Sequence, residues 1–330
     1  PGGAPWAIRQ KQTGVDLVSL GGSISANAHG RGLRMQPLGA DIEDLQLVLP
    51  NGDLRHCSRT ENAELFSLAV GGYGLFGVIA SATLRLTPRQ RLRRLVDVLD
   101  LEDAQVAIWR RIEQGCVYGA FQFVIDADDP RFLTRGVMAC YEPVSSPPMR
   151  NASFAAQPAE HGAHAPGEPS PDDWLGLLRL AHVDKAAAFR RYAQHYLGTH
   201  GQVYDADTLQ LATYLPDYAD LMQAANSTQP HAPIKETLVI GEHYVPYAHI
   251  GRFMRAAQTV LRGRGAELIY GTIRAIAQDQ TSFLPWARQP SACVVFNLRT
   301  PHTPVGLART ASAFRGLIDA ALKLGGSYFL

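Results

Sequence analysis

In the first part of the chain, short apolar segments are separated by turn residues. Asp44 to Leu49 is apolar enough for a buried strand, and the Asn-Gly pair that follows it predicts a turn over residues 50–53. Residues 61–70 show a helical pattern of apolar positions. Residues 78–86 (VIASATLRL) are rich in residues that favour strands. The pattern therefore predicts two short strands and a helix in this part.

Longer periodic segments follow later in the chain. Between residues 250 and 261 the apolar side chains recur at the i, i+3, i+4, i+7 spacing of an amphipathic helix, and Gly263 and Gly265 end it. The pattern predicts further helices over 179–197 and 307–324, and strands over 237–245, 268–276 and 292–298. Helices and strands are mixed without an internal repeat, which predicts an α+β fold.

Two segments interrupt these patterns. Pro88 precedes a run of arginines that we interpret as a solvated linker, because no aromatic residues are interleaved as they would be in a nucleic-acid patch: Arg89, Arg91, Arg93 and Arg94. Residues 142–173 are rich in Pro, Ala and Ser and predict a mobile loop. His161 and His164 lie in that loop, where two ligands alone would leave the coordination of a metal unfilled. We place a domain boundary at residue 90, which gives domains 1–90 and 91–330.

Composition excludes several classes of protein. The chain has 330 residues, of which 46% are hydrophobic and 18% charged, as in globular domains rather than disordered segments. The net charge of +1 gives no field that would attract nucleic acid. No apolar run reaches the roughly 20 residues of a membrane helix. The scattered cysteines argue against a zinc site or disulfide framework, and we expect a reducing compartment, the cytoplasm, and no metal: Cys57, Cys116, Cys140 and Cys293.

Two glycine-rich segments carry the candidate chemistry. Residues 20–32 (LGGSISANAHGRG) end a run of tiny residues with His29 and Arg31, and such bare backbone lets peptide N–H groups approach a ligand. Residues 72–77 match the spelling Gly-x-Gly-x-x-Gly of a dinucleotide-binding motif. A Rossmann motif follows a strand and opens a helix, whereas here a helix precedes the glycines and a strand follows. We therefore disfavour an NAD(P)-dependent dehydrogenase, which stays the alternative together with a non-catalytic module that has lost its cofactor.

These residues resemble a known family. The segments SLGGSISANAHGRG, ELF, VGGYGLFGVI and TLRLTP, in this order over residues 14–88, resemble the second half of the FAD-binding domain of the FAD-linked oxidases, which are vanillyl-alcohol oxidase-like proteins with a PCMH-type FAD-binding domain. The likeness is greatest to the decaprenylphosphoryl-ribose oxidase and sugar-lactone or alditol oxidase kind. It implies that residues 1–90 are the C-terminal part of the FAD-binding domain, and that residues 91–330 form an α+β cap domain with an antiparallel sheet.

The resemblance also assigns roles to individual residues. It implies that the backbone near the FAD pyrophosphate and ribityl chain comes from Gly14, Ser19, Leu20, Gly21 and Gly22. The residues beside the flavin would be Ala26, Asn27, Ala28 and His29, and Ile79 would offer its backbone to the adenine. A structural histidine is the alternative for His29. Arg31 faces either substrate or solvent.

The cap domain offers one catalytic candidate. Thr272 and Arg274 share a face of a predicted strand that resembles the active-site strand of polyol and lactone oxidases, in which an acidic residue stands where this chain has Thr272. An arginine over the flavin would orient a hydroxyl-bearing substrate. A surface arginine is the alternative. Cys293, on the next predicted strand, either faces the same cavity or is a buried structural cysteine.

The resulting hypothesis is an FAD-dependent oxidoreductase. It would oxidise a hydroxyl-bearing carbon of a sugar, polyol or lactone-like small molecule and pass the electrons to an acceptor, oxygen or a quinone. The family's first phosphate-binding loop and its C-terminal segment have no counterpart in this sequence, so we expect the chain to be part of a longer protein.

Overall fold

The computed structural model describes residues 6–10, 18–145, 170–206 and 234–329. Their strands form three sheets, and all the strand pairings between them are antiparallel. The predicted mixture of helices with antiparallel sheet is confirmed. Most of the predicted mobile loop, residues 146–169 with both of its histidines, lies outside the described residues.

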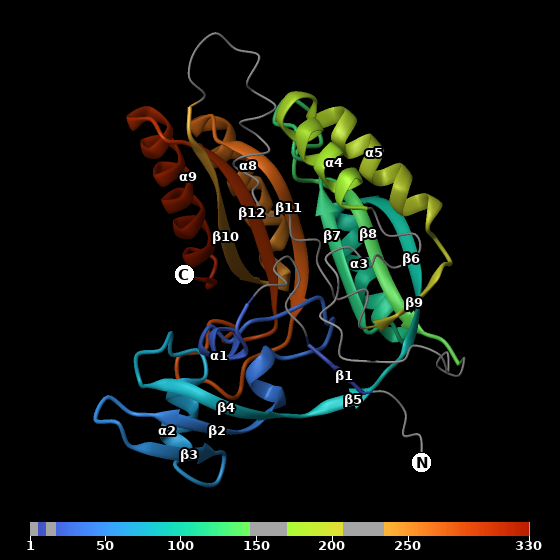
Figure 1. The fold of residues 1–330 in the computed structure, drawn as a ribbon. Helices are drawn as coiled ribbons and strands as arrows, with labels where there is room; N and C mark the ends of the chain where they lie inside the picture. The colour runs from blue at the N-terminus through green and yellow to red at the C-terminus, as the bar shows by residue number, and fades with distance from the viewer. Residues whose placement is uncertain (1–5, 11–17, 146–169, 207–233, 330) are drawn as a thin grey trace.

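An eight-stranded sheet dominates the upper part of the molecule in Figure 1. Its strand order is β13-β10-β12-β11-β7-β8-β6-β9. The strands are β6 (Arg91–Asp100), β7 (Tyr118–Phe123), β8 (Arg135–Pro143), β9 (Val203–Asp205), β10 (Glu236–Pro246), β11 (Glu267–Ile276), β12 (Ser291–Pro301) and β13 (Ser327–Phe329). The pairing of β10 with β12 continues over the full length of both strands.

Two smaller sheets lie below it. One has the order β3-β2-β4, and the other pairs β1 with β5 (Figure 1). Their strands are β1 (Trp6–Ile8), β2 (Ile42–Val48), β3 (Leu54–Ser58), β4 (Val78–Leu84) and β5 (Leu86–Pro88). The Asn-Gly turn between β2 and β3 is as predicted, since Gly52 has a φ of +88° and its N–H donates to the Leu49 carbonyl.

Helices cover both faces of the large sheet. They are α3 (Leu101–Glu113), α4 (Pro171–Val183), α5 (Lys185–Gly198), α8 (Ile250–Arg264) and α9 (Pro304–Leu322), with a short 3-10 turn, η2 (Tyr247–His249), before α8. The smaller part contains α1 (Leu20–Ser25), η1 (Leu38–Asp41) and α2 (Ala63–Ala69). Side chains of α3, α8 and α9 share one large core with alternate residues of the sheet.

Helix α8 shows how the pattern produces packing. Its buried residues recur every three or four positions, so that one stripe faces the sheet: Ile250, Phe253, Met254, Ala257 and Leu261. Full burial of a large apolar side chain contributes about 1.5–3 kcal/mol. The helix ends where Gly265 adopts a φ of +58°, a left-handed conformation that costs glycine little.

Two sequence predictions are wrong. The arginine run after Pro88 is no solvated linker, because Arg91 to Arg94 begin β6 and Arg94 is 0% exposed. The helix predicted over 179–197 is two helices, since the chain breaks at Asp184, whose φ of −151° and ψ of 84° are not helical. The Asp184 side chain accepts the Ala187 N–H and so caps α5.

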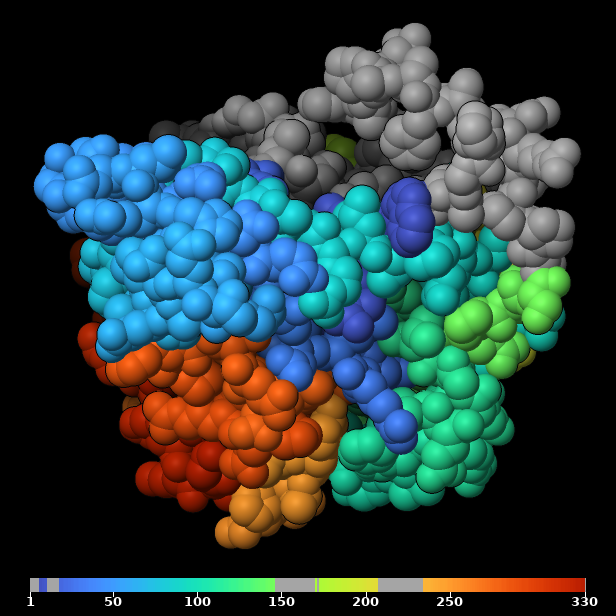
Figure 2. Space-filling view, turned by 90° about the horizontal axis from the view of Figure 1, so that it is seen from below, coloured from blue at the N-terminus to red at the C-terminus, as the bar shows by residue number. Residues whose placement is uncertain are grey.

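The face of the large sheet opposite α8 and α9 carries the polar residues of interest. Glu242 and Tyr244 on β10, Cys293 on β12 and Arg274 on β11 alternate with residues of the large core. In the view from below, the blue and cyan surface of the N-terminal part adjoins both the orange and the green parts of the chain (Figure 2). The N-terminal part therefore packs against the part of the chain that forms the large sheet.

Candidate functional site

The two glycine-rich segments lie against each other. The N–H of Gly71 donates to the Ile24 carbonyl at 3.0 Å, and the N–H of Tyr73 donates to the Ser25 carbonyl at 2.9 Å. Helix α1 also packs on β4. Gly21 lies so close to this strand that an added Cβ would be 3.4 Å from the Ile79 carbonyl oxygen. Residues predicted to bind one cofactor are thus side by side, with Gly14 outside the described residues.

The exposed side of this pair of segments is the start of α1. Ser19 caps the helix, since its Oγ accepts the Gly22 N–H at 3.0 Å. Ser19, Leu20 and Gly22 are exposed, and the first amide groups of a helix have no acceptor within it. The Gly22 N–H is taken by the Ser19 side chain, which leaves the N–H groups of Leu20 and Gly21 for a ligand.

The second glycine cluster follows α2 and precedes β4, the order that the sequence predicts. Glycine is needed here for the path of the chain itself. Gly71, Gly74 and Gly77 have positive φ, and a Cβ on Gly77 would lie 2.6 Å from the Val48 carbonyl oxygen. The arrangement is unlike a Rossmann turn, where the glycines open a helix.

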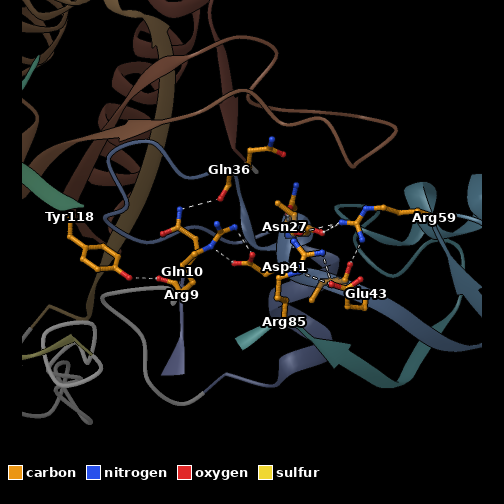
Figure 3. A network of polar contacts seen from close by, with 12 residues as sticks. Arg9, Gln10, Asn27, Gln36, Asp41, Glu43, Arg59, Arg85 and Tyr118 are labelled. Atoms are coloured by element: carbon orange, nitrogen blue, oxygen red, sulfur yellow. Dashed lines mark hydrogen bonds and ion pairs between the residues drawn. The ribbon is translucent and has the colours of Figure 1, made fainter. Parts of the chain in front are cut away.

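A polar network fixes the loop that follows α1 (Figure 3). Asn27, 0% exposed and with a φ of +47°, accepts the Gly39 N–H and donates to Asp279 Oδ2, both at 2.9 Å. Arg9 pairs with the buried Asp41, and the Tyr118 hydroxyl donates to the Arg9 carbonyl at 2.7 Å. The network ties β1 and the loop after α1 to the large sheet.

Two residues further on, His29 enters a buried cluster. The His29 cluster consists of six residues from five parts of the chain: His29, Glu242, Tyr244, Arg274, Trp286 and Cys293. His29 Nδ1 lies 3.1 Å from the Gly30 carbonyl oxygen, and His29 Nε2 lies 3.2 Å from Glu242 Oε2. The structure therefore places His29 against a carboxylate.

The remaining members surround this pair. The Tyr244 hydroxyl donates to Glu242 Oε2 at 2.7 Å, and its ring stacks on Trp286 with centroids 4.2 Å apart. Cys293 Sγ lies 3.6 Å from His29 Nε2, so this cysteine does face the cluster. Glu242 is 20% exposed, whereas His29 is 4% exposed. Glu242 is thus the side of the pair that reaches solvent.

Arg274 is buried, not a surface arginine. It is 6% exposed, lies opposite Cys293 in the β11–β12 pairing, and its Nε has no hydrogen-bond partner among the described residues. Thr272, on the same face of β11, donates to the Phe121 carbonyl at 3.2 Å. A buried guanidinium with an unpartnered N–H is uncommon in folded proteins, and a role in binding or catalysis is one explanation for it.

The electrostatics of the cluster favour separated charges. Burial raises the pKa of Glu242, but the charge and hydrogen bond of His29, the charge of Arg274 and the Tyr244 hydroxyl outweigh it and lower the pKa to about 2. Burial and the Glu242 charge raise the pKa of Tyr244 and of the Cys293 thiol well above their usual ranges. Glu242 is therefore a carboxylate, while Tyr244 and Cys293 keep their protons.

The cluster also contains three potential metal ligands. One ligating atom each of His29, Glu242 and Cys293 lie within 4.8 Å of one another. The positive charge of Arg274 acts on the same carboxylate and disfavours a second cation, and the Cys293 thiol is not a thiolate. We keep the prediction that no metal binds.

Sequence reasoning missed Glu242, Tyr244 and Trp286. The first two stand two apart in TLVIGEHYV, a segment correctly predicted as a strand, so their shared face could have been read from the sequence. Nothing in the sequence links that strand to His29. Arg31 lies in a separate hollow lined by tyrosines, close to Thr272.

Comparison with curated proteins finds oxidases and dehydrogenases. The chain is similar to cytokinin dehydrogenase 9 of Oryza sativa subsp. japonica, 36% identical over 86 residues, which are 26% of this chain and 16% of the relative. It is similar to L-gulonolactone oxidase of Bos taurus, 33% identical over 98 residues, 28% of this chain and 22% of the relative. It is also similar to decaprenylphosphoryl-beta-D-ribose oxidase of Mycolicibacterium smegmatis, 31% identical over 86 residues, 26% of this chain and 19% of the relative.

Each of these matches spans less than a quarter of the relative's own length. No protein-family model matches the chain. The relatives are FAD-linked oxidases, and they are FAD-dependent flavoproteins. The resemblance of this chain to the FAD-linked oxidases is confirmed.

Proposed function

We propose that this chain is part of an FAD-dependent oxidoreductase that oxidises a hydroxyl-bearing carbon of a sugar, polyol or lactone-like substrate. The observation that carries the proposal is the buried Arg274 with its unpartnered Nε, beside the His29–Glu242 pair. The family resemblance puts His29 next to the flavin and Arg274 over it. Similarity to lactone and sugar oxidases gives independent support.

The residues present fit FAD. Bare backbone is exposed at Ser19 and Gly22, and apolar side chains at or beside the same two segments are exposed: Val18 at 47%, Leu20 at 43% and Val78 at 70%. A cofactor with flat rings and a pyrophosphate suits such a surface. The backbone of residues 19–22 and of Ile79 would hold it. We accordingly propose residues 1–90 as part of a PCMH-type FAD-binding domain and residues 91–330 as the cap domain.

When bound, FAD would accept a hydride from the hydroxyl-bearing carbon of the substrate. In this chain the Arg274 guanidinium is the group that orients the substrate hydroxyl. When the proton on Nδ1 donates to the Gly30 carbonyl, His29 presents Nε2 as an acceptor for the hydroxyl proton. Once Nε2 carries that proton, it donates to Glu242 Oε2 at 3.2 Å, and the carboxylate stabilises the resulting charge. Glu242 stays a carboxylate throughout and, as the more exposed partner, faces solvent.

The partners follow from the same proposal. The protein would take a small-molecule substrate and an electron acceptor, oxygen or a quinone, and the cytoplasmic location stays a prediction. Among the described residues, no helix is long and apolar enough to cross a membrane.

A visible spectrum of the full-length protein tests the function. We expect a yellow protein with absorbance bands at roughly 370 and 450 nm, which bleach when a suitable sugar, polyol or lactone is added without oxygen. A colourless protein that takes up no added FAD would contradict the proposal and favour a non-catalytic module. A protein that binds NAD(P)H instead would restore the dehydrogenase alternative.

A further inference from the structure

Arg31 lies in a hollow on the same face of the large sheet as Arg274. We call this the tyrosine hollow, since four tyrosines line it together with Arg31 and Thr272: Tyr141, Tyr192, Tyr196 and Tyr270. Strand β11 contributes Tyr270 and Thr272, four and two residues before Arg274, so the hollow continues the face that carries the His29 cluster. The two sites are neighbours along one strand.

The backbone at Arg31 is held in place. Its carbonyl accepts the Gly119 N–H of β7 at 2.9 Å, and the next residue, Gly32, forms a bridge with Tyr118. The N–H of Leu33 donates to the Val117 carbonyl at 2.9 Å. The guanidinium is therefore aimed at the hollow by a fixed segment of chain.

The Arg31 side chain has no acidic partner among the described residues. Its Nε is inaccessible to solvent and makes no hydrogen bond there, and no Asp or Glu lines the hollow. Burial opposes the charge of Arg31, but the surrounding tyrosines, Tyr196 and Tyr270 foremost, outweigh it and raise its pKa. A charged guanidinium thus stands in the hollow with an unmet N–H, which is costly unless something pairs with it.

Arg94, a second buried arginine in this region, is held by side-chain hydrogen bonds. It lies against two of the same tyrosines, Tyr141 and Tyr196, with its guanidinium 5.4 and 4.8 Å from their ring centroids. Unlike Arg31, it donates to side-chain oxygens, to the Tyr141 hydroxyl at 3.2 Å and to Thr199 Oγ1 at 2.8 Å. Two arginines around shared tyrosines, without a lining carboxylate, make the hollow electropositive.

The size of the hollow limits what can enter. About 270 Å³ of empty space, its mouth included, lies between the lining residues, and the enclosed part has room for about one water-sized group. An oxygen of an acidic group fits such a space, whereas a whole sugar ring does not. Guanidinium and tyrosine hydroxyl groups are both hydrogen-bond donors that suit carboxylate or phosphate oxygens.

We propose that the tyrosine hollow binds an acidic group of the substrate, a carboxylate or a phosphate, while the hydroxyl-bearing carbon lies at the His29 cluster. The position of the reacting carbon rests on the proposed function, whereas the binding of an acidic group in the tyrosine hollow does not. The substrate is then an acidic sugar derivative or polyol derivative, and Arg31 is a specificity-determining residue that faces the substrate.

Calorimetric titration of the full-length protein with three polyols that differ in charge tests the proposal. The probes are gluconate, a sorbitol phosphate and neutral sorbitol. We expect at least one of the two anions to bind at least about tenfold more tightly than sorbitol, as charge-assisted hydrogen bonds provide. Whether gluconate or the sorbitol phosphate binds more tightly distinguishes a carboxylate site from a phosphate site. Equal binding of all three would overturn the proposal.

Variants assign the effect to Arg31. Arg31→Gln should remove the preference for anions, and Arg31→Lys should restore only part of it, because an ammonium lacks the planar fork. Arg34→Gln is the matched control, since Arg34 lies three residues away and is exposed. If Arg31→Gln does not fold, Tyr270→Phe removes one hydroxyl donor and should weaken anion binding several-fold. An unchanged preference in Arg31→Gln, or in Tyr270→Phe where that variant replaces it, would overturn the proposal.

The outcome separates this inference from the function. A yellow protein whose flavin is reduced by sorbitol, without any preference for anions, would overturn the inference and leave the oxidoreductase standing. A colourless protein that prefers gluconate would overturn the oxidoreductase and leave the anion site standing.

Discussion

Asn27 and His29 stand two residues apart on the same loop, and both are buried, yet their surroundings differ. Asn27 meets a backbone N–H with its carbonyl and a carboxylate with its amide, each at 2.9 Å. Around His29, by contrast, buried polar atoms are left without a partner among the described residues, namely Arg274 Nε and Trp286 Nε1.

The contrast separates structure from chemistry. A buried polar network whose members are all hydrogen-bonded holds one conformation, as the Asn27 network holds the loop against the large sheet (Figure 3). A cluster with unmet donors and a strongly shifted carboxyl pKa is a candidate for binding or catalysis. Substitutions in the Asn27 network should therefore lower the free energy of unfolding, whereas substitutions in the His29 cluster should lower the rate of the reaction.

The largest effect is expected on the structural side. Asn27→Ala removes two buried hydrogen bonds and leaves the Gly39 N–H without its acceptor, and it forces alanine into a left-handed conformation. We expect a loss of about 3 kcal/mol in the free energy of unfolding, measured by urea denaturation. Asn27→Gly, which tolerates the backbone, separates the conformational part. The exposed Asn51→Ala, which removes one surface hydrogen bond from the Asp53 N–H, should lose less than about 1 kcal/mol, and an equal loss in both alanine variants would contradict the structural role.

Arg274→Ala should lower the rate of the reaction. Flavin content should stay nearly unchanged, because the proposed FAD contacts are backbone groups elsewhere in the chain. Flavin reduction by substrate should slow by about 10²-fold or more, which corresponds to about 2.7 kcal/mol of transition-state stabilisation. Arg274→Lys should recover only part of the rate. An alanine variant reduced at the wild-type rate, in stopped-flow measurements without oxygen, would remove Arg274 from the mechanism.

The sequence predicts the helices and strands far better than it predicts which buried residues surround Asn27 and His29. The strands around Glu242, Arg274 and Cys293 follow from short-range patterns and are confirmed. That His29 meets Glu242, more than two hundred residues later, depends on how the N-terminal part docks on the large sheet, and no local pattern encodes docking. The family resemblance supplied His29 and Arg274 but gave no reason to pick Glu242 or Tyr244.

The arginines show a second limit. A run of four arginines after a proline has the composition of a solvated segment, and β6 nevertheless buries Arg94 completely. Tertiary context overrides composition here because Tyr141, Tyr196 and Tyr204 offer ring faces to the guanidinium, and those tyrosines come from three other elements or turns of the chain. A single sequence does not reveal such partners.

The smallest of the three effects is a dependence of stability on pH. The pKa of Glu242 is about 2 in the folded protein, against an ordinary value of 4.5. Because the folded pKa is the lower one, the unfolded chain binds the proton first as the pH falls. The stability that the Glu242 carboxylate contributes is thus complete above about pH 5 and is lost as the pH falls from there toward 2.

Glu242→Gln makes this dependence measurable. At pH 3 the wild-type protein should have lost about 2 kcal/mol of unfolding free energy relative to pH 7 through this one group, and the glutamine variant should lack that share of the loss. Glu113→Gln, at an exposed carboxylate of α3, is the control and should keep the wild-type pH dependence. Urea denaturation at several pH values between 7 and 3 measures the difference. If wild type and Glu242→Gln lose stability in parallel, Glu242 is not held as a carboxylate by its neighbours, and the cluster loses the charge separation on which its proposed role depends.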